Sequence, residues 1–138
     1  MSSEDDVARI VAEFPDVGET TKWRNRTWTT GGAGFAWIRP FSKADVKRFG
    51  AEPVPTGEIL AVSTDGMDDK AALLETRPDV YFDIEHLAGY PALLVQLESV
   101  DETTLQDVLL EAWLAVADEA RAKAFLAQRQ PGRSNEGG

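Results

Sequence analysis

Hydrophobic positions recur at helical spacing near both ends of this chain. The N-terminal stripe consists of Val7, Ile10, Val11 and Phe14. The C-terminal stripe consists of Leu105, Val108, Leu109, Ala112, Trp113, Val116 and Ala117. Residues three and four apart share one face of a helix, so the stripes predict an N-terminal helix that ends at Pro15 and a long C-terminal helix. Thr103 and Gln106 have the spacing of a capping box at the start of the second helix.

The segments between these helices have the composition and alternation of strands. Residues 20–30 and 34–39 are rich in Thr and Trp and are joined by glycines, which predicts a β-hairpin compatible with a kink near Asn25. Further strands are predicted over residues 58–64, 80–84 and 92–98. Short helices are predicted over residues 42–49, with a capping box of Ser42 and Asp45, and over residues 67–76 before Pro78.

This order of elements predicts an α+β fold. We expect a two-layer sandwich with a largely antiparallel sheet, packed by the N-terminal helix and the long C-terminal helix. A chain of 138 residues has the usual length of one domain, which we place at residues 1–130. Residues 131–138 are polar and rich in Gly, and they cannot bury enough apolar surface to offset the entropy of ordering. We therefore expect a disordered tail there.

Composition excludes several classes of function. The chain has no Cys, which rules out disulfides, cysteine zinc sites and thiol nucleophiles. Its net charge of −10 repels nucleic acid and anionic membranes at long range, so contact with nucleic acid requires a local basic face. The acidic N-terminus leads into an amphipathic segment and has neither a signal-peptide nor a spanning pattern. We expect a cytoplasmic protein without a membrane partner.

Catalytic chemistry has weak support in this sequence. His86 is the single histidine, and neither a Cys nucleophile nor a second His for a metal site accompanies it. The glycines at positions 31, 32 and 34 lie between two predicted strands, whereas a phosphate loop lies between a strand and a helix. We expect a non-enzymatic domain without cofactor or metal, in which His86 is structural or exposed.

One segment reverses the charge of the chain. Between residues 22 and 48, seven cations stand against the single acid Asp45, so this segment carries +6 and all other residues together carry −16. Three of the cations alternate with Trp23 and its neighbours, which places them on one face of a strand. Cations beside aromatic rings suit nucleic acid or an acidic protein, and they equally suit a solvated sheet face. The predicted contact residues are Lys22, Arg24, Arg26, Trp28, Arg39, Lys43, Lys47 and Arg48.

Four segments carry a resemblance to a known family. Residues 14–21, 34–37, 86–95 and 110–113 read FPDVGETT, GFAW, HLAGYPALLV and LEAW. Together they resemble the MmcQ/YjbR family, small bacterial domains with a CyaY-like (frataxin-like) fold that are described as DNA-binding proteins. The resemblance covers about residues 7 to 117 and implies no catalytic residues. It implies a binding module, and the charge count places the contact surface of that module on the basic, aromatic hairpin from Lys22 to Arg48.

Two other functions remain open. An exposed sheet face or edge is able to dock a partner protein or a second copy of the chain, with Trp28 and Trp37 as anchors. The frataxin likeness implies weak iron binding on an acidic ridge, although an acidic helix start is normally a solvated face. The residues of that ridge are Glu4, Asp5, Asp6, Glu13, Asp16 and Glu19.

Overall fold

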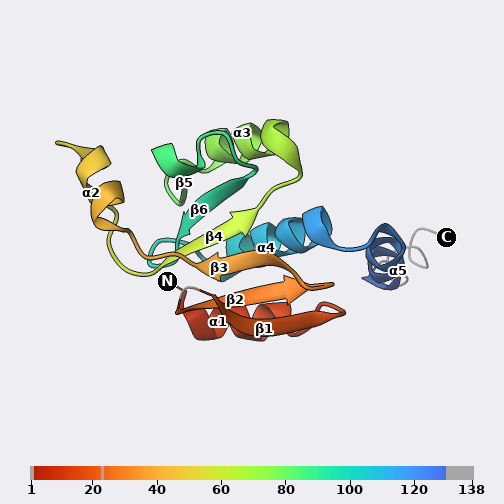
Figure 1. The fold of residues 1–138 in the computed structure, drawn as a ribbon. Helices are drawn as coiled ribbons and strands as arrows, with labels where there is room; N and C mark the ends of the chain where they lie inside the picture. The colour runs from red at the N-terminus through yellow and green to blue at the C-terminus, as the bar shows by residue number, and fades with distance from the viewer. Residues whose placement is uncertain (1, 23, 130–138) are drawn as a thin grey trace.

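The structure is a computed structural model that describes residues 2–22 and 24–129 (Figure 1). Its helices are α1 (Glu4–Val11), α2 (Lys43–Phe49), α3 (Gly66–Thr76), the 3₁₀ helix η1 (Glu85–Leu87), α4 (Glu102–Val116) and α5 (Glu119–Arg129). Its strands are β1 (Val17–Lys22), β2 (Asn25–Thr30), β3 (Ala33–Ile38), β4 (Ile59–Ser63), β5 (Tyr81–Phe82) and β6 (Ala92–Gln96). The strands form one sheet in the order β1-β2-β3-β4-β6-β5, and all neighbouring pairs are antiparallel. The predicted α+β sandwich is confirmed.

The first half of the sheet differs from the prediction. Residues 20–30 do not form one strand, because the chain reverses between Lys22 and Asn25, which pair with each other across the turn. Arg24 has a left-handed φ of 67° in this turn, a conformation in which a residue leaves the extended path of a strand. The predicted hairpin is therefore a meander of three strands, β1, β2 and β3.

The C-terminal helix also differs in its limits. The N-cap of α4 is Asp101, two residues before the predicted cap Thr103, because the Asp101 side chain accepts a hydrogen bond from the Thr104 backbone N–H at 3.2 Å. A second helix, α5, follows α4 and was not predicted. The capping box of Ser42 and Asp45 at α2 is confirmed. Trp23 and the tail predicted over residues 131–138 lie outside the described residues.

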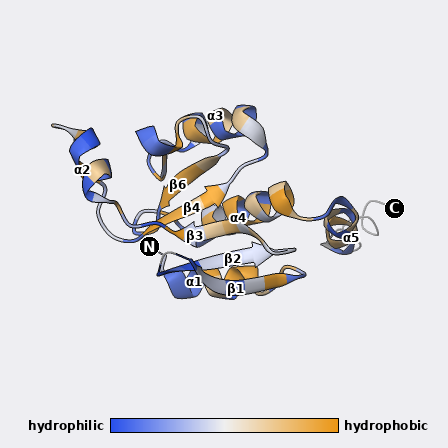
Figure 2. Ribbon diagram, viewed as in Figure 1, coloured by the Kyte–Doolittle hydropathy of each residue, from blue (hydrophilic) through white to orange (hydrophobic). Residues whose placement is uncertain are grey.

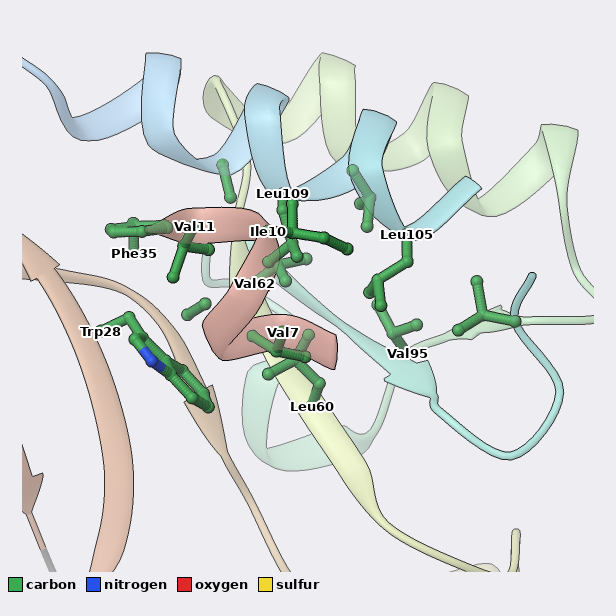
Figure 3. Packing of buried hydrophobic residues seen from close by; sticks show 14 of the residues in the cluster. Val7, Ile10, Val11, Trp28, Phe35, Leu60, Val62, Val95, Leu105 and Leu109 are labelled. Atoms are coloured by element: carbon green, nitrogen blue, oxygen red, sulfur yellow. The ribbon is translucent and has the colours of Figure 1, made fainter. Parts of the chain in front are cut away.

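The main core lies between one face of the sheet and helices α1 and α4 (Figure 3). α1 contributes the predicted stripe, in which Val7, Ile10 and Val11 are buried. The predicted stripe of α4 is buried from Leu105 to Trp113. Strand residues that meet these helices include Trp28, Phe35, Leu60, Val62 and Val95.

A smaller apolar cluster covers part of the opposite face, which we call the open face because α1 and α4 do not pack on it. It consists of the buried residues Ile59, Ala61, Ile84, Leu87 and Leu94, with Trp37, Phe41, Phe49 and Phe82 packed against them. Residues 59–62 and 92–95 are each at most 3% exposed, so β4 and β6 are covered on both faces. In Figure 2, hydrophobic residues are concentrated on β4, β6 and α4, whereas β2 is more hydrophilic. Within the described residues, no helix combines the length and the apolar character that crossing a membrane requires.

Candidate functional site

A groove of about 620 Å³ lies on the open face, beside the smaller cluster. We call it the open-face groove. Its lining residues are Lys22, Asn25, Thr27, Gly34, Trp37, Ile38, Arg39, Pro40, Ser42, His86, Leu87 and Tyr90. A volume of this size lies within the range of small-ligand sites in proteins.

Strands β1, β2 and β3 form the floor of the groove. Lys22 pairs with Asn25 across the β1–β2 turn, and Thr27 pairs with Trp37 across β2 and β3. Paired residues, and residues two apart on one strand, project from the same face of a sheet. The four side chains therefore share the open face. Trp37 is half-buried and packs against the smaller cluster, so its ring is held in place at the floor.

The opposite wall comes from the segment between β5 and β6, residues 83–91. Ile84 and Leu87 are buried in the smaller cluster and hold this segment on the open face. His86 and Tyr90 are exposed and line the groove, and Tyr90 is 53% exposed. The wall thus combines two buried anchors with two side chains that a ligand can reach.

Arg39 is fixed at the end of the groove by α2. Its Nη1 donates hydrogen bonds to Asp45 Oδ2 at 2.8 Å and to the Pro40 carbonyl at 3.2 Å. Burial by itself raises the pKa of Asp45, but hydrogen bonds from Arg39 and from the Ser42 backbone outweigh it, so the pKa is lowered. Among the described residues, all side-chain hydrogen bonds from Arg39 come from Nη1, while its backbone N–H donates to the Ile59 carbonyl at 2.9 Å. Its Nε and Nη2 donors remain available to a ligand.

The lining has an unusual charge for this chain. It contains Lys22, Arg39 and His86, and none of its described residues is Asp or Glu. The protein as a whole has a net charge of −10. The groove is therefore a local site where an anion meets cationic and aromatic side chains rather than carboxylates.

Arg26 and Trp28, two of the predicted contact residues, lie on the other face. Thr21 pairs with Arg26, so Arg26 projects away from Lys22 and toward the helices. Arg26 forms ion pairs with Glu19 at 2.9 Å and Glu4 at 3.4 Å, and its guanidinium lies 5.1 Å from the Trp28 ring centroid. The hydrogen bond between Glu19 and Arg26 raises the pKa of Arg26 and lowers that of Glu19. Trp28 is 1% exposed in the main core.

The remaining predicted residues lie outside the groove lining. Arg24 is exposed in the β1–β2 turn, and Lys43 and Lys47 are exposed on α2. Arg48, also on α2, lies 4.0 Å from Asp45 and 3.7 Å from Glu85. The structure thus brings Lys22 and Arg39 together in one groove. It keeps Lys43, Lys47 and Arg48 together on α2, outside the lining, and turns Arg26 and Trp28 to the other face.

The acidic ridge near α1 is engaged with cations. Asp6 accepts a hydrogen bond from Arg9, and Asp16 from Arg121 at 2.9 Å. Glu4 and Glu19 both pair with Arg26. Within residues 2–22 and 24–129, no three or more His, Asp or Glu side chains are grouped closely enough to hold a metal ion.

Sequence reasoning did not predict Asn25, Thr27, His86 and Tyr90 as site residues. Local patterns offered one signal, a His and a Tyr within the short segment before the apolar residues 92–95. That signal identifies a loop. It does not reveal that the loop lies opposite β1, β2 and β3, which depends on the packing of the smaller cluster.

The chain has relatives among mycobacterial proteins. Uncharacterized protein Rv2570 of Mycobacterium tuberculosis and uncharacterized protein Mb2600 of Mycobacterium bovis are each 39% identical to it over 130 residues. The match covers 92% of this chain and 98% of each relative. This chain belongs to the family of these two proteins. Membership assigns no activity, because both relatives are described as uncharacterized. No family model matches the chain.

A solved structure has the same fold. The crystal structure of Deinococcus radiodurans protein DR2400, which has the family-model domain DUF419, matches this chain with a TM-score of 0.62. The match covers 90% of this chain and 88% of that chain at 18% sequence identity. Likeness at this identity shows the fold alone, since one fold serves many functions.

Proposed function

We propose that this protein is a non-enzymatic binding module of the MmcQ/YjbR type that takes single-stranded nucleic acid in the open-face groove. The composition of the groove lining carries the proposal. The described residues that line the groove include cations and aromatic rings but no Asp or Glu, although the protein has a net charge of −10. Proteins bind single strands by pairing basic side chains with phosphates and stacking bases on aromatic rings. Lys22 and Arg39 suit the first role, and Trp37 and Tyr90 suit the second.

The size of the groove favours a single strand over a duplex. A cavity of about 620 Å³ has room for isolated bases and their phosphates. A duplex keeps its bases stacked inside, where Trp37 on the groove floor cannot reach their faces. Negative charge over the remaining surface further disfavours the broad phosphate contacts that duplex binding uses.

The proposal is tested by fluorescence anisotropy with a labelled oligothymidine of about 10 nucleotides, within the site sizes known for single-strand binding. We expect saturable binding at low salt. Tyr90→Ala should weaken it by about 5- to 150-fold, because a stacked base contributes about 1 to 3 kcal/mol. Lys22→Glu should weaken it as well.

The matched control is Lys123→Glu, which makes the same charge change on an exposed residue of α5 that lies outside the groove lining. It should leave affinity unchanged. Equal losses in Lys22→Glu and Lys123→Glu would mean that bulk charge, and not the groove, determines binding. Absence of binding at low salt would exclude nucleic acid as the ligand, and tighter binding of the matching duplex would exclude the single-strand form.

A second candidate function is docking of a protein or a second copy of the chain at the sheet edge. β1 is an edge strand, and its residues 18–22 are exposed. Such an edge offers backbone groups for addition of a further strand. Light scattering at high protein concentration separates the alternatives: a wild type that remains monomeric excludes self-association.

A further inference from the structure

A buried lysine lies directly behind the wall of the open-face groove. Lys70 on α3 is 2% exposed, although lysine is rarely buried in proteins unless its ammonium is paired. Its Nζ donates hydrogen bonds to the Leu87 carbonyl at 2.6 Å and the Tyr90 carbonyl at 2.9 Å. It also forms an ion pair with Asp83 Oδ1 at 3.1 Å. Two carbonyl oxygens and one carboxylate therefore surround the ammonium.

All three acceptors belong to residues 83–91, the segment that forms the groove wall. This segment has little regular structure of its own, since η1 comprises three residues. Its internal bonds are short-range, such as Leu87 N–H to the Ile84 carbonyl and Tyr90 N–H to the Leu87 carbonyl. Local bonds of this kind open easily without an outside anchor. Outside anchors come from the buried side chains of Ile84 and Leu87 and from the Thr64 N–H, which donates to the Pro91 carbonyl at 2.8 Å. Lys70 adds a polar anchor at the middle of the segment, from a helix 13 or more positions away in sequence.

We infer that Lys70 is a positioning residue for ligand binding: it holds the 83–91 segment in the place where His86 and Tyr90 form the groove wall. Lys70 does not line the groove, and its side chain is nearly inaccessible, so it acts through the segment rather than on the ligand. A buried carbonyl that loses its donor must find water or another partner. Removing the ammonium therefore favours detachment of the segment from the sheet. The binding part of this inference rests on the function proposed above.

The first test is hydrogen exchange on Lys70→Met, which keeps the apolar stem and removes the ammonium. We expect the amides of Leu87, Ala88 and Tyr90 to exchange on the order of tenfold faster or more, with amides of β2 and β3 unchanged. Lys123→Met is the control, because it removes the same charge from an exposed site on α5. Wild-type exchange rates at these three amides in folded Lys70→Met would overturn the inference.

Asp83→Asn provides a milder variant in case Lys70→Met does not fold. It removes the charge partner of Lys70 and keeps an oxygen that can accept the hydrogen bond from the Ile84 amide. The same amides should exchange faster than in wild type, by a smaller factor. Unchanged exchange in this variant contradicts the inference equally.

The second test is a double-mutant cycle on oligothymidine affinity. If Lys70 acts by placing Tyr90, the losses from Lys70→Met and Tyr90→Ala should be strongly non-additive. The losses from Lys70→Met and Lys22→Glu should add, because Lys22 comes from β1. Equal coupling to both residues would indicate general destabilisation and overturn the positioning role. A wild type that binds no oligonucleotide would refute the proposed function, while the exchange test would still decide the anchoring role.

Discussion

At the scale of single residues, Trp113 joins three parts of the helical layer. It is fully buried on α4, and its ring centroid lies 5.8 Å from that of Phe14 and 5.3 Å from that of Phe125. Its Nε1 donates a hydrogen bond to the Pro15 carbonyl at 3.2 Å. One side chain therefore ties the segment after α1 and the helix α5 to α4.

Truncation of this residue should be severe. Trp113→Ala leaves a large cavity and should lower the free energy of unfolding by about 3 to 5 kcal/mol, a large share of the stability of a domain this size. Arg24→Ala is the control, because Arg24 is exposed in the β1–β2 turn, and its change should stay within about 0.5 kcal/mol. Denaturant melts measure both. A Trp113→Ala midpoint equal to that of wild type, with an unchanged slope, would contradict the described core.

At the scale of elements, α2 is attached to the end of the groove through one buried carboxylate. Asp45 is 3% exposed and caps its own helix by accepting a hydrogen bond from the Ser42 N–H at 2.9 Å. The same carboxylate accepts from Arg39, the residue that follows β3. A helix of seven residues has little stability alone, so this contact determines its position.

Removal of that carboxylate should loosen α2. Asp45→Ala eliminates the cap and the partner of Arg39 and should lower the free energy of unfolding by about 1.5 to 3 kcal/mol, as loss of hydrogen bonds to a charged group does. Asp68→Ala removes an exposed carboxylate from the first turn of α3 and serves as the control. In thermal melts, Asp45→Ala should have a lower melting temperature than Asp68→Ala. Equal melting temperatures would show that the Asp45 network does not contribute to stability.

At the scale of the whole molecule, an acidic protein carries a small cationic groove. Contact with nucleic acid should therefore involve few phosphates, because the rest of the surface repels them. The lining offers Lys22 and Arg39 for this purpose.

The number of neutralised phosphates determines how steeply binding affinity should fall with salt. About two neutralised phosphates of a single strand give a slope of about −1.4 in log affinity against log salt. Lys22→Ala should reduce the magnitude of the slope by about 0.7, the value for one phosphate. Lys123→Ala should leave it unchanged. Anisotropy titrations at several salt concentrations measure the slope. A slope that is the same in wild type and Lys22→Ala would mean that Lys22 does not contact a phosphate.

The sequence by itself determined the elements whose signals are local. The stripe that begins with Val7 and the stripe around Trp113 follow from the helical period, and the Ser42–Asp45 capping box depends on residues three apart. These patterns, together with the runs at 59–63 and 92–96, were sufficient for the fold class. Local chemistry acts on neighbours in the chain, and neighbours are visible in a sequence.

Only the tertiary structure decided where the charged side chains go. The chain reverses between Lys22 and Asn25, which places Lys22 and Arg26 on opposite faces of the sheet, and no alternation rule reveals such a reversal in advance. The carboxylates that neutralise Arg26 come from α1 and β1, and the wall of the groove comes from residues more than 45 positions after its floor. Counting charge along the chain identified residues 22–48 as a positively charged segment. Burial and pairing across the fold select which of its cations a ligand can meet, because these depend on distances in space rather than in sequence.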